Sequence, residues 1–436
     1  MTNANLSYVR EEMLSPQDPP LGQTGVIRWL RENLFSSWLN AILTILSVWF
    51  VWTVASHLFP WFYNSIWSGG SLNECREIRD ATLGQGASAA CFAVISERWQ
   101  QLLFGFYPSD GYWRPILALF LFVGSIMPVL FAALPRKLLV TTCAAPFVLV
   151  WLLWGGSIWV AVSVALGFLV GFAVYRVVSS LKVSSLWAML AAIAAPIAYW
   201  SFLHGLVSGA LSGMIPIELS KVQSKEFGGF TLSVIIGIAG IVLSLPLGIL
   251  LALGRQSNLF LIKYVSVGFI EVIRGVPLIA WLFTASLLLN YFLPPGTNFD
   301  LMLRVIIMVT LFSAAYIAEV IRGGLAALPK GQYEAANALG LDYWLSMRLI
   351  ILPQALKISI PGIVNTFIGL FKDTTLVVFI GLLDPIGLAG AIRASTDWQG
   401  IYWELFIFIG LMFFIFCYSM GRYSLYLEKK LQREHR

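Results

Sequence analysis

Hydrophobic residues fill the chain in long unbroken blocks, and short polar segments separate them. Most blocks approach the ~20 residues that a helix needs to cross a bilayer. Ten such blocks cover residues 37–59, 115–134, 138–154, 157–178, 185–203, 230–253, 262–289, 301–321, 358–383 and 402–423. Inside lipid, a helix satisfies its own backbone hydrogen bonds. The pattern therefore predicts an all-α, polytopic membrane protein with about ten transmembrane helices, in a range of eight to ten.

Composition agrees with this pattern. The 436 residues are 58% hydrophobic and only 11% charged, and the mean hydropathy is +0.81. Soluble domains carry about 25% charged residues, so a soluble protein of this size is excluded. The unbroken apolar runs also argue against a porin-type barrel, whose strands alternate apolar and polar residues.

The basic residues predict an orientation. The net charge is +6, and placing both termini in the cytoplasm puts most Lys and Arg on the cytoplasmic side. The polar residues 1–35 then form a cytoplasmic tail with no cleavable signal peptide. Residues 61–113 become the largest external loop. In an oxidising periplasm, Cys75 and Cys91 of this loop either form a disulfide or remain two separate thiols.

A long polar insertion separates the eighth and ninth blocks, within residues 322–353. Residues 334–339 favour a helix, Gly340 can end it, and residues 343–349 can start another. Two short helices joined by a tight turn would form a compact knob on the cytoplasmic face. We therefore expect a docking element for a soluble partner.

The spacing in this insertion resembles a known signature. Glu-Ala-Ala, three residues, Gly, nine residues, Ile, one residue and Leu-Pro are typical of permease subunits of bacterial ABC importers. The matching residues are Glu334, Ala335, Ala336, Gly340, Ile350, Leu352 and Pro353. The resemblance implies that this loop inserts into a cleft on a separate ATPase and transmits its closure.

Four further segments look like the polar amino-acid branch of these permeases: residues 228–232, 271–278, 318–324 and 372–376. Phe227 stands where this branch often has Trp. The resemblance implies a type I importer core of five helices over residues 226–436. Residues 36–225, a transmembrane extension that includes the external loop 61–113, look like the amino-terminal region of general L-amino-acid permeases. That group includes carriers of glutamate, glutamine, aspartate and asparagine.

The resemblance also implies partners and a location. Expected partners are an ATPase dimer, a second permease subunit, a periplasmic amino-acid-binding protein, the L-amino acid and the lipid bilayer. The chain would lie in the bacterial inner membrane and import polar or many L-amino acids. ATP and Mg²⁺ would bind to the ATPase, so no cofactor, metal, nucleic acid or catalytic residue is expected in this chain. Consistent with that, the sequence has no phosphate-binding loop motif.

Charges within the apolar blocks are candidates for substrate contact: Glu271, Arg274, Lys372 and Asp373, followed by Thr374. An amino acid is a zwitterion, so its carboxylate favours Arg or Lys and its ammonium favours Asp or Glu. The alternatives are that these charges form salt bridges between helices or that they lie at helix ends. Glu271 and Arg274 are three residues apart, so they can also meet on one helix face. Glu319 with Arg322 fits a structural or coupling pair.

Helix interruptions are expected at Gly275 with Pro277 and at Pro361 with Gly362, since broken helices often build small-solute sites in membranes. An ion-coupled secondary amino-acid transporter is the alternative function. Such transporters tend to show repeated halves, and none is evident in this sequence. Either two copies of this chain or one copy with a sister permease would complete the translocator.

Overall fold

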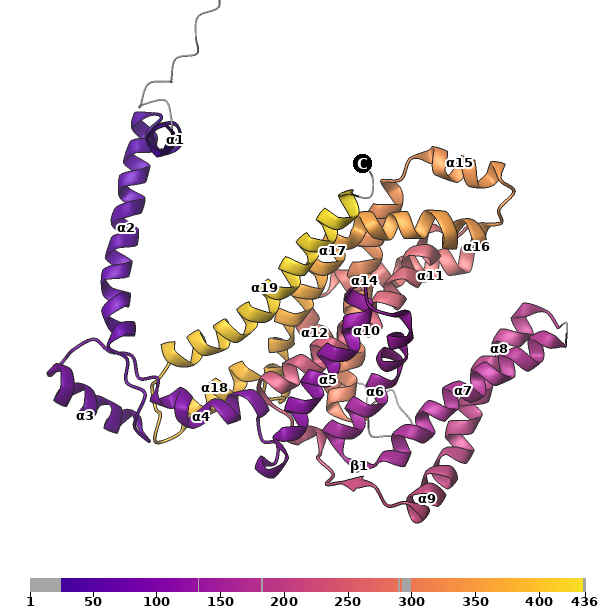
Figure 1. The fold of residues 1–436 in the computed structure, drawn as a ribbon, viewed down its shortest axis with the longest axis horizontal. Coiled ribbons are helices and arrows are strands. Elements are labelled where there is room, and N and C mark those ends of the chain that lie inside the picture. The colour runs from indigo at the N-terminus through magenta and orange to yellow at the C-terminus, as the bar shows by residue number, and fades with distance from the viewer. Residues whose placement is uncertain (1–24, 132, 182, 289–290, 292–298, 434–436) are drawn as a thin grey trace, which may run out of the picture. The chain divides into compact units, whose positions relative to one another are not determined.

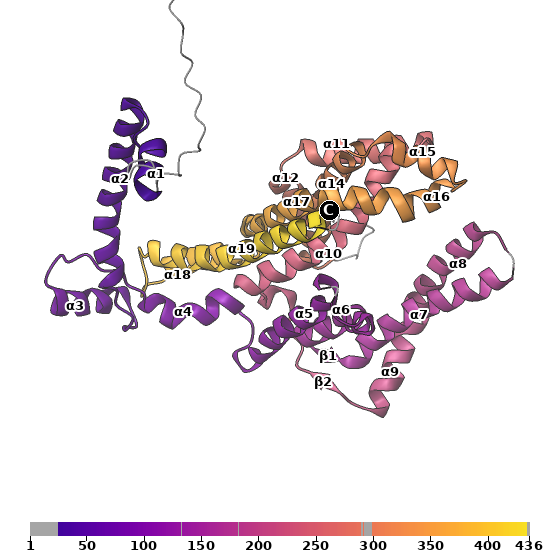
Figure 2. The same cartoon turned by 45° about the horizontal axis from the view of Figure 1, so that its top comes forward.

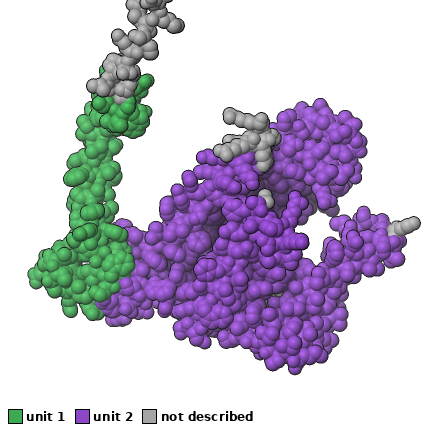
Figure 3. All heavy atoms as spheres, in the orientation of Figure 1, with its two compact units in different colours: residues 1–68, 73–92 green, residues 69–72, 93–436 purple. Residues whose placement is uncertain are grey.

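The structure, a computed structural model, describes residues 25–131, 133–181, 183–288, 291 and 299–433. Of the predicted tail 1–35, residues 1–24 lie outside this description. The chain divides into two compact units (Figure 3). The first contains residues 1–68 and 73–92, and the second contains residues 69–72 and 93–436.

The first unit contains α1 (Gly25–Asn33), α2 (Trp38–Tyr63) and nearly all of α3 (Leu72–Leu83). Ser37 caps α2, because its hydroxyl accepts the backbone N–H of Asn40 at 3.2 Å. A disulfide joins Cys75 of α3 to Cys91. The ring of the neighbouring Phe92 packs against three aromatic residues, Trp61, Phe62 and Trp67.

The second unit is almost entirely helical (Figure 1). Its α-helices are α4 (Ala93–Phe104), α5 (Trp113–Leu130), α6 (Leu139–Trp154), α7 (Ile158–Ser180), α8 (Ser185–Ala198), α9 (His204–Met214), α10 (Gly229–Gln256), α11 (Phe260–Gly275), α12 (Leu278–Phe283), α14 (Leu301–Ala326), α15 (Lys330–Ala338), α16 (Tyr343–Ser346), α17 (Leu352–Asp373), α18 (Pro385–Ala394) and α19 (Trp403–Arg433). Two short antiparallel strands, β1 (Gly156–Ser157) and β2 (Glu218–Leu219), pair before α7 and before α10.

Transmembrane spans follow the prediction. Within the described residues, nine helices are long and apolar enough to cross a membrane, and the number is ten if one bent pair of helices counts as a span. In that pair, α11 and residues 278–288 meet at an angle of 103°. The predicted break at Gly275 and Pro277 is therefore confirmed.

The predicted break at Pro361 and Gly362 is wrong, because α17 runs through both residues. Transmembrane helices tolerate proline where neighbouring helices and side chains compensate for the lost hydrogen bond. Gly362 instead lets α17 pack closely against α14. A Cβ atom on it would lie 2.6 Å from Cγ1 of Val320 on α14.

Small residues let the central helices α10, α14 and α17 approach each other closely. One face of α10 buries Gly237, Gly240, Ser244 and Gly248 at helical spacing. A Cβ atom on Gly248 would lie 2.6 Å from Cγ2 of Ile317 on α14. Such small-residue interfaces drive helix association in lipid, where burial of apolar surface gives little advantage. Helices α17 and α19 run side by side in both views (Figures 1 and 2).

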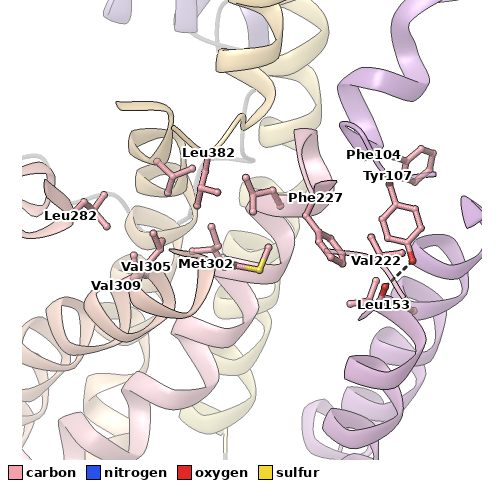
Figure 4. Packing of buried hydrophobic residues seen from close by; sticks show 14 of the residues in the cluster. Phe104, Tyr107, Leu153, Val222, Phe227, Leu282, Met302, Val305, Val309 and Leu382 are labelled. Carbon is pink, nitrogen blue, oxygen red and sulfur yellow. Dashed lines mark hydrogen bonds between the residues drawn. The ribbon is translucent and has the colours of Figure 1, made fainter. Parts of the chain in front are cut away.

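Helix α4, which belongs to the predicted external loop, packs against α10, α18 and α19. At the end of α4, Gly105 forms a bridge with Phe227 just before α10. The Phe227 ring packs against the rings of Tyr107 and Trp154, with centroid distances of 5.3 and 4.7 Å. Figure 4 shows Phe227 and Tyr107 among the buried residues of this region. Three segments of the chain thus share one aromatic cluster around Phe227.

A buried arginine strengthens this junction. Arg114, at the start of α5, donates to the carbonyl oxygens of Leu152, Leu153 and Ser220. The first two carbonyls belong to the last turn of α6, which has no intrahelical donor for them. Tyr107 donates its hydroxyl to the same Leu153 oxygen at 2.8 Å, and burial raises the pKa of this phenol to about 12.

Candidate functional site

The loop between α14 and α17 has the predicted two-helix form. Helix α15 ends at Ala338, and Gly340 follows with φ +69°. The N–H of Leu341 donates to the carbonyl of Ala336, and that of Gly340 donates to the carbonyl of Asn337. This pair of bonds is a Schellman motif, and its left-handed position favours glycine. Gly340 therefore sets the turn between the two short helices.

The second short helix is continuous with the span that follows. Asp342 caps α16 by accepting the N–H of Leu345 at 2.7 Å. A π-helical segment, Met347–Ile351, then leads directly into α17, with Pro353 in the first turn. A displacement of α16 would therefore act directly on α17, because no flexible linker separates them.

The signature residues of this loop divide by exposure. Glu334, Ala335, Gly340 and Pro353 are exposed, whereas Ala336 is fully buried. Ile350 and Leu352 are half-buried. Exposed apolar side chains accompany the exposed signature residues: Leu339, Tyr343, Trp344, Leu345 and Leu349. The loop thus presents both polar and large apolar side chains to whatever lies beyond it.

An ion-pair network lies near the same end of α14. Arg255, in the last turn of α10, places Nη1 2.9 Å from Glu271 Oε1 and 2.9 Å from Glu319 Oε1. Arg322 pairs with Glu319 at 3.0 Å, as expected for residues three apart on α14. We refer to Arg255, Glu271, Arg274, Glu319 and Arg322 as the five-residue network.

Arg274 belongs to this network through Glu319, which lies 3.6 Å away, and not through Glu271. Its guanidinium also stands over the Tyr316 ring, 5.4 Å from the centroid. Its Nε atom is buried and has no hydrogen-bond partner. Glu271 and Arg274, three residues apart on α11, are not paired with each other among the described ion pairs, and Glu271 pairs with Arg255 instead. Arg274 nevertheless keeps a donor available.

The second group of candidates lies where α17 ends. Asp373 is the last residue of α17, and Thr374 begins a 3₁₀ helix that continues to Ile380. Lys372 is exposed, Asp373 is half-buried, and the buried Thr374 donates its hydroxyl to the Phe371 carbonyl at 2.8 Å. Helix α12, which follows the break after Gly275, packs against this 3₁₀ helix.

Three structurally important residues were not predicted as site residues: Arg255, Arg114 and Asp384. Asp384 is fully buried and caps α18 by accepting the N–H groups of Ile386 and Gly387. Burial raises its pKa to about 6, against the lowering effect of these hydrogen bonds. The Asp384–Pro385 pair is itself a helix-start signal that sequence reasoning can detect.

No group of three or more His, Cys, Asp or Glu that could hold a metal occurs within the described part of the chain. The geometry is that of a polytopic helical membrane protein with a protruding loop, a broken span and charges at helix ends.

Comparison with known proteins agrees with this class. Residues 244–433 match the family model described as the binding-protein-dependent transport system inner membrane component. The glutamate/glutamine/aspartate/asparagine transport system permease protein BztC of Rhodobacter capsulatus is 54% identical over 99% of this chain and 100% of its own length. The inner membrane amino-acid ABC transporter permease protein YhdY of Escherichia coli is 39% identical over 92% of both chains.

A crystal structure of an amino acid ABC transporter with histidines is 31% identical, with a TM-score of 0.41, over 45% of this chain and 90% of that one. The sequence relationships define the class, a transport subunit that spans the membrane many times. The chain belongs to the family of amino-acid ABC transporter permeases.

Proposed function

We propose that this chain is the transmembrane subunit of an ABC importer that carries L-amino acids from the periplasm to the cytoplasm. A separate ATPase supplies the energy. The observation that carries the proposal is the loop of α15 and α16. Its exposed Glu334 and Ala335 stand beside exposed Leu339 and Trp344, and α16 continues into α17. Such a surface suits a partner that pushes on the transmembrane helices.

The substrate would be recognised as a zwitterion. Arg274 would meet the carboxylate with its unpaired donor, and an acidic residue, Glu271 or Asp373, would meet the ammonium group. Lys372 and Thr374 belong to the same proposed site, which the packing of α12 on the 3₁₀ helix would complete. The name of the Rhodobacter capsulatus relative suggests acidic amino acids and their amides as substrates.

The proposed assembly contains this permease, a second permease, two ATPase subunits and a periplasmic binding protein. It lies in the inner membrane with both termini of this chain in the cytoplasm. ATP and Mg²⁺ bind to the ATPase. Within the chain, we propose that residues 1–35 form the tail, 36–225 the extension and 226–436 the translocating core, with docking loop 322–353.

Reconstitution tests the function. Proteoliposomes containing the permeases and the ATPase should take up labelled glutamate, glutamine, aspartate or asparagine when the binding protein is outside and ATP is inside. Uptake should stop without ATP or without the binding protein. Uptake driven by a sodium or proton gradient in the absence of ATP would refute the proposal and support a secondary transporter.

A further inference from the structure

Helix α1 carries apolar and basic residues on different faces and buries none of its nine residues. At 100° per residue, Val26, Ile27, Trp29 and Leu30 fall within one arc of the helix, and Arg28 and Arg31 fall outside it. The four apolar side chains are 72%, 60%, 55% and 36% exposed. A helix with this pattern needs an apolar surface beneath it.

The position of α1 relative to the first span is fixed by hydrogen bonds. The N–H groups of Leu34 and Phe35 both donate to the carbonyl of Leu30, and the Thr44 hydroxyl of α2 donates to the Leu34 carbonyl at 2.8 Å. Only four residues separate the end of α1 from the start of α2 at Trp38. Helix α1 therefore adjoins the first end of α2, which is long and apolar enough to span a membrane.

We propose that α1 lies in the plane of the membrane surface and binds anionic phospholipids. Its apolar arc enters the boundary between headgroups and acyl chains, and Arg28 and Arg31 contact the phosphate groups. Trp29 with the exposed Phe35 and Trp38 supplies aromatic residues at the level where membrane proteins concentrate them.

The charges on α1 are compatible with this role. Arg28 pairs with Glu32 at 2.8 Å, and both side chains are more than half exposed. An exposed pair of this kind is weak, so a phosphate can replace the carboxylate at little cost. Arg31 has no ion pair in the described structure. Lipid is favoured over a protein partner because the neighbouring span already places this helix at the bilayer.

Spin labels on the full chain in nanodiscs test the proposal. Cys143 and Cys417 are first replaced by Ala, while the Cys75–Cys91 disulfide remains. One label is placed by Val26→Cys within the apolar arc, and another by Glu32→Cys outside it. Collision with oxygen, which concentrates in lipid, is compared with collision with a water-soluble nickel chelate. Nanodiscs contain either phosphatidylcholine alone or a mixture with phosphatidylglycerol.

The label at position 26 should collide mainly with oxygen, and the label at position 32 mainly with nickel. Phosphatidylglycerol should increase the oxygen preference at position 26 by up to about fivefold for each arginine. Arg28→Gln with Arg31→Gln should abolish this increase, and the matched change of both to Lys should preserve it.

Three results would overturn the proposal. Equal nickel access at both positions would mean that α1 lies in water. Shielding of position 26 from both reagents would mean that a protein surface covers the apolar arc. A phosphatidylglycerol effect that survives the Gln exchange would remove the two arginines from the proposed contact.

Discussion

The guanidinium of Arg274 on α11 lies 3.6 Å from the carboxylate of Glu319 on α14, although Glu271 is only three residues away on its own helix. Glu319 also contacts Arg255 and Arg322, so one carboxylate faces three arginines. Only 15% of the Glu319 side chain is exposed, compared with 55% for Glu271. Glu319 is therefore the centre of the five-residue network.

Replacing Glu319 by Gln should destabilise the protein markedly. The exchange removes the carboxylate that three guanidinium groups share, and a hydrogen bond to a charged group contributes about 2 kcal/mol. Thermal unfolding in detergent, followed by circular dichroism, measures the effect. Glu271→Gln is the matched control. Its carboxylate is half exposed and contacts Arg255 alone, so the loss should stay below about 1 kcal/mol. Equal losses of stability in the two variants would show that Glu319 is not the centre of the five-residue network.

Arg274→Ala should strongly reduce transport while the assembly stays intact. The substrate carboxylate would lose its proposed partner, but the binding protein would still capture the amino acid. Uptake by proteoliposomes, ATPase co-purification and binding-protein affinity are measured together. Arg274→Lys keeps the charge and should retain part of the uptake. A normal uptake rate for assembled Arg274→Ala would remove Arg274 from the substrate site.

Gly340→Asp should weaken the ATPase contact without removing the subunit from the membrane. Gly340 has φ +69° with open space around it, so the strain comes from its backbone conformation and not from a clash. We expect less ATPase to co-purify. Asn and Asp both adopt this left-handed conformation more readily than other side chains, but Asn adds no charge to the docking surface, so Gly340→Asn should be milder. Gly331→Ala lies in the same loop at a helical position and should behave as wild type. Equal co-purification in all three variants would exclude a docking role for the turn.

Topology can be measured with reporter fusions. Fusions after Arg255 and Arg436 should report the cytoplasm, and a fusion after Asp110 should report the periplasm, because this arrangement places most Lys and Arg inside. Arg255 lies at the end of α10, near the same end of α14 that leads to the docking loop. A periplasmic signal after Arg255 would place that loop on the wrong side for an ATPase.

Asp384 should make stability depend on pH. Its pKa rises from 3.8 to about 6 on burial, so the folded protein holds the proton more tightly than the unfolded chain. This contribution is complete below pH 3.8 and is lost as the pH rises through about 6, which amounts to ~3 kcal/mol.

Asp384→Asn carries no such charge. Its stability relative to wild type should therefore increase between pH 4 and pH 7.5, as measured by thermal unfolding at both values. The same exchange at Asp342, an exposed helix cap, controls for substituting one capping side chain by another. If the difference in stability between Asp384→Asn and wild type is the same at both pH values, the raised pKa of Asp384 is contradicted.

The sequence by itself determined the elements. Apolar blocks marked the spans, because length and hydrophobicity decide whether a helix can cross a bilayer. Gly275 with Pro277 marked the break between α11 and α12, and Gly340 marked the docking turn, because both depend on local backbone preferences. The sequence wrongly predicted a helix break at Pro361 with Gly362. Gly362 instead packs against Val320 on another helix, and this contact depends on the tertiary structure.

Tertiary structure alone decided which charges meet. Glu271 and Arg274 have the spacing of a helix pair, yet each binds a residue on another helix, Arg255 on α10 and Glu319 on α14. Likewise, Arg114 reaches a carbonyl at the end of α6 and the carbonyl of Ser220, which directly follows β2. Helical periodicity gives the face on which a charge lies. The partner across that face depends on how distant helices pack, and side-chain spacing along a single helix does not encode it.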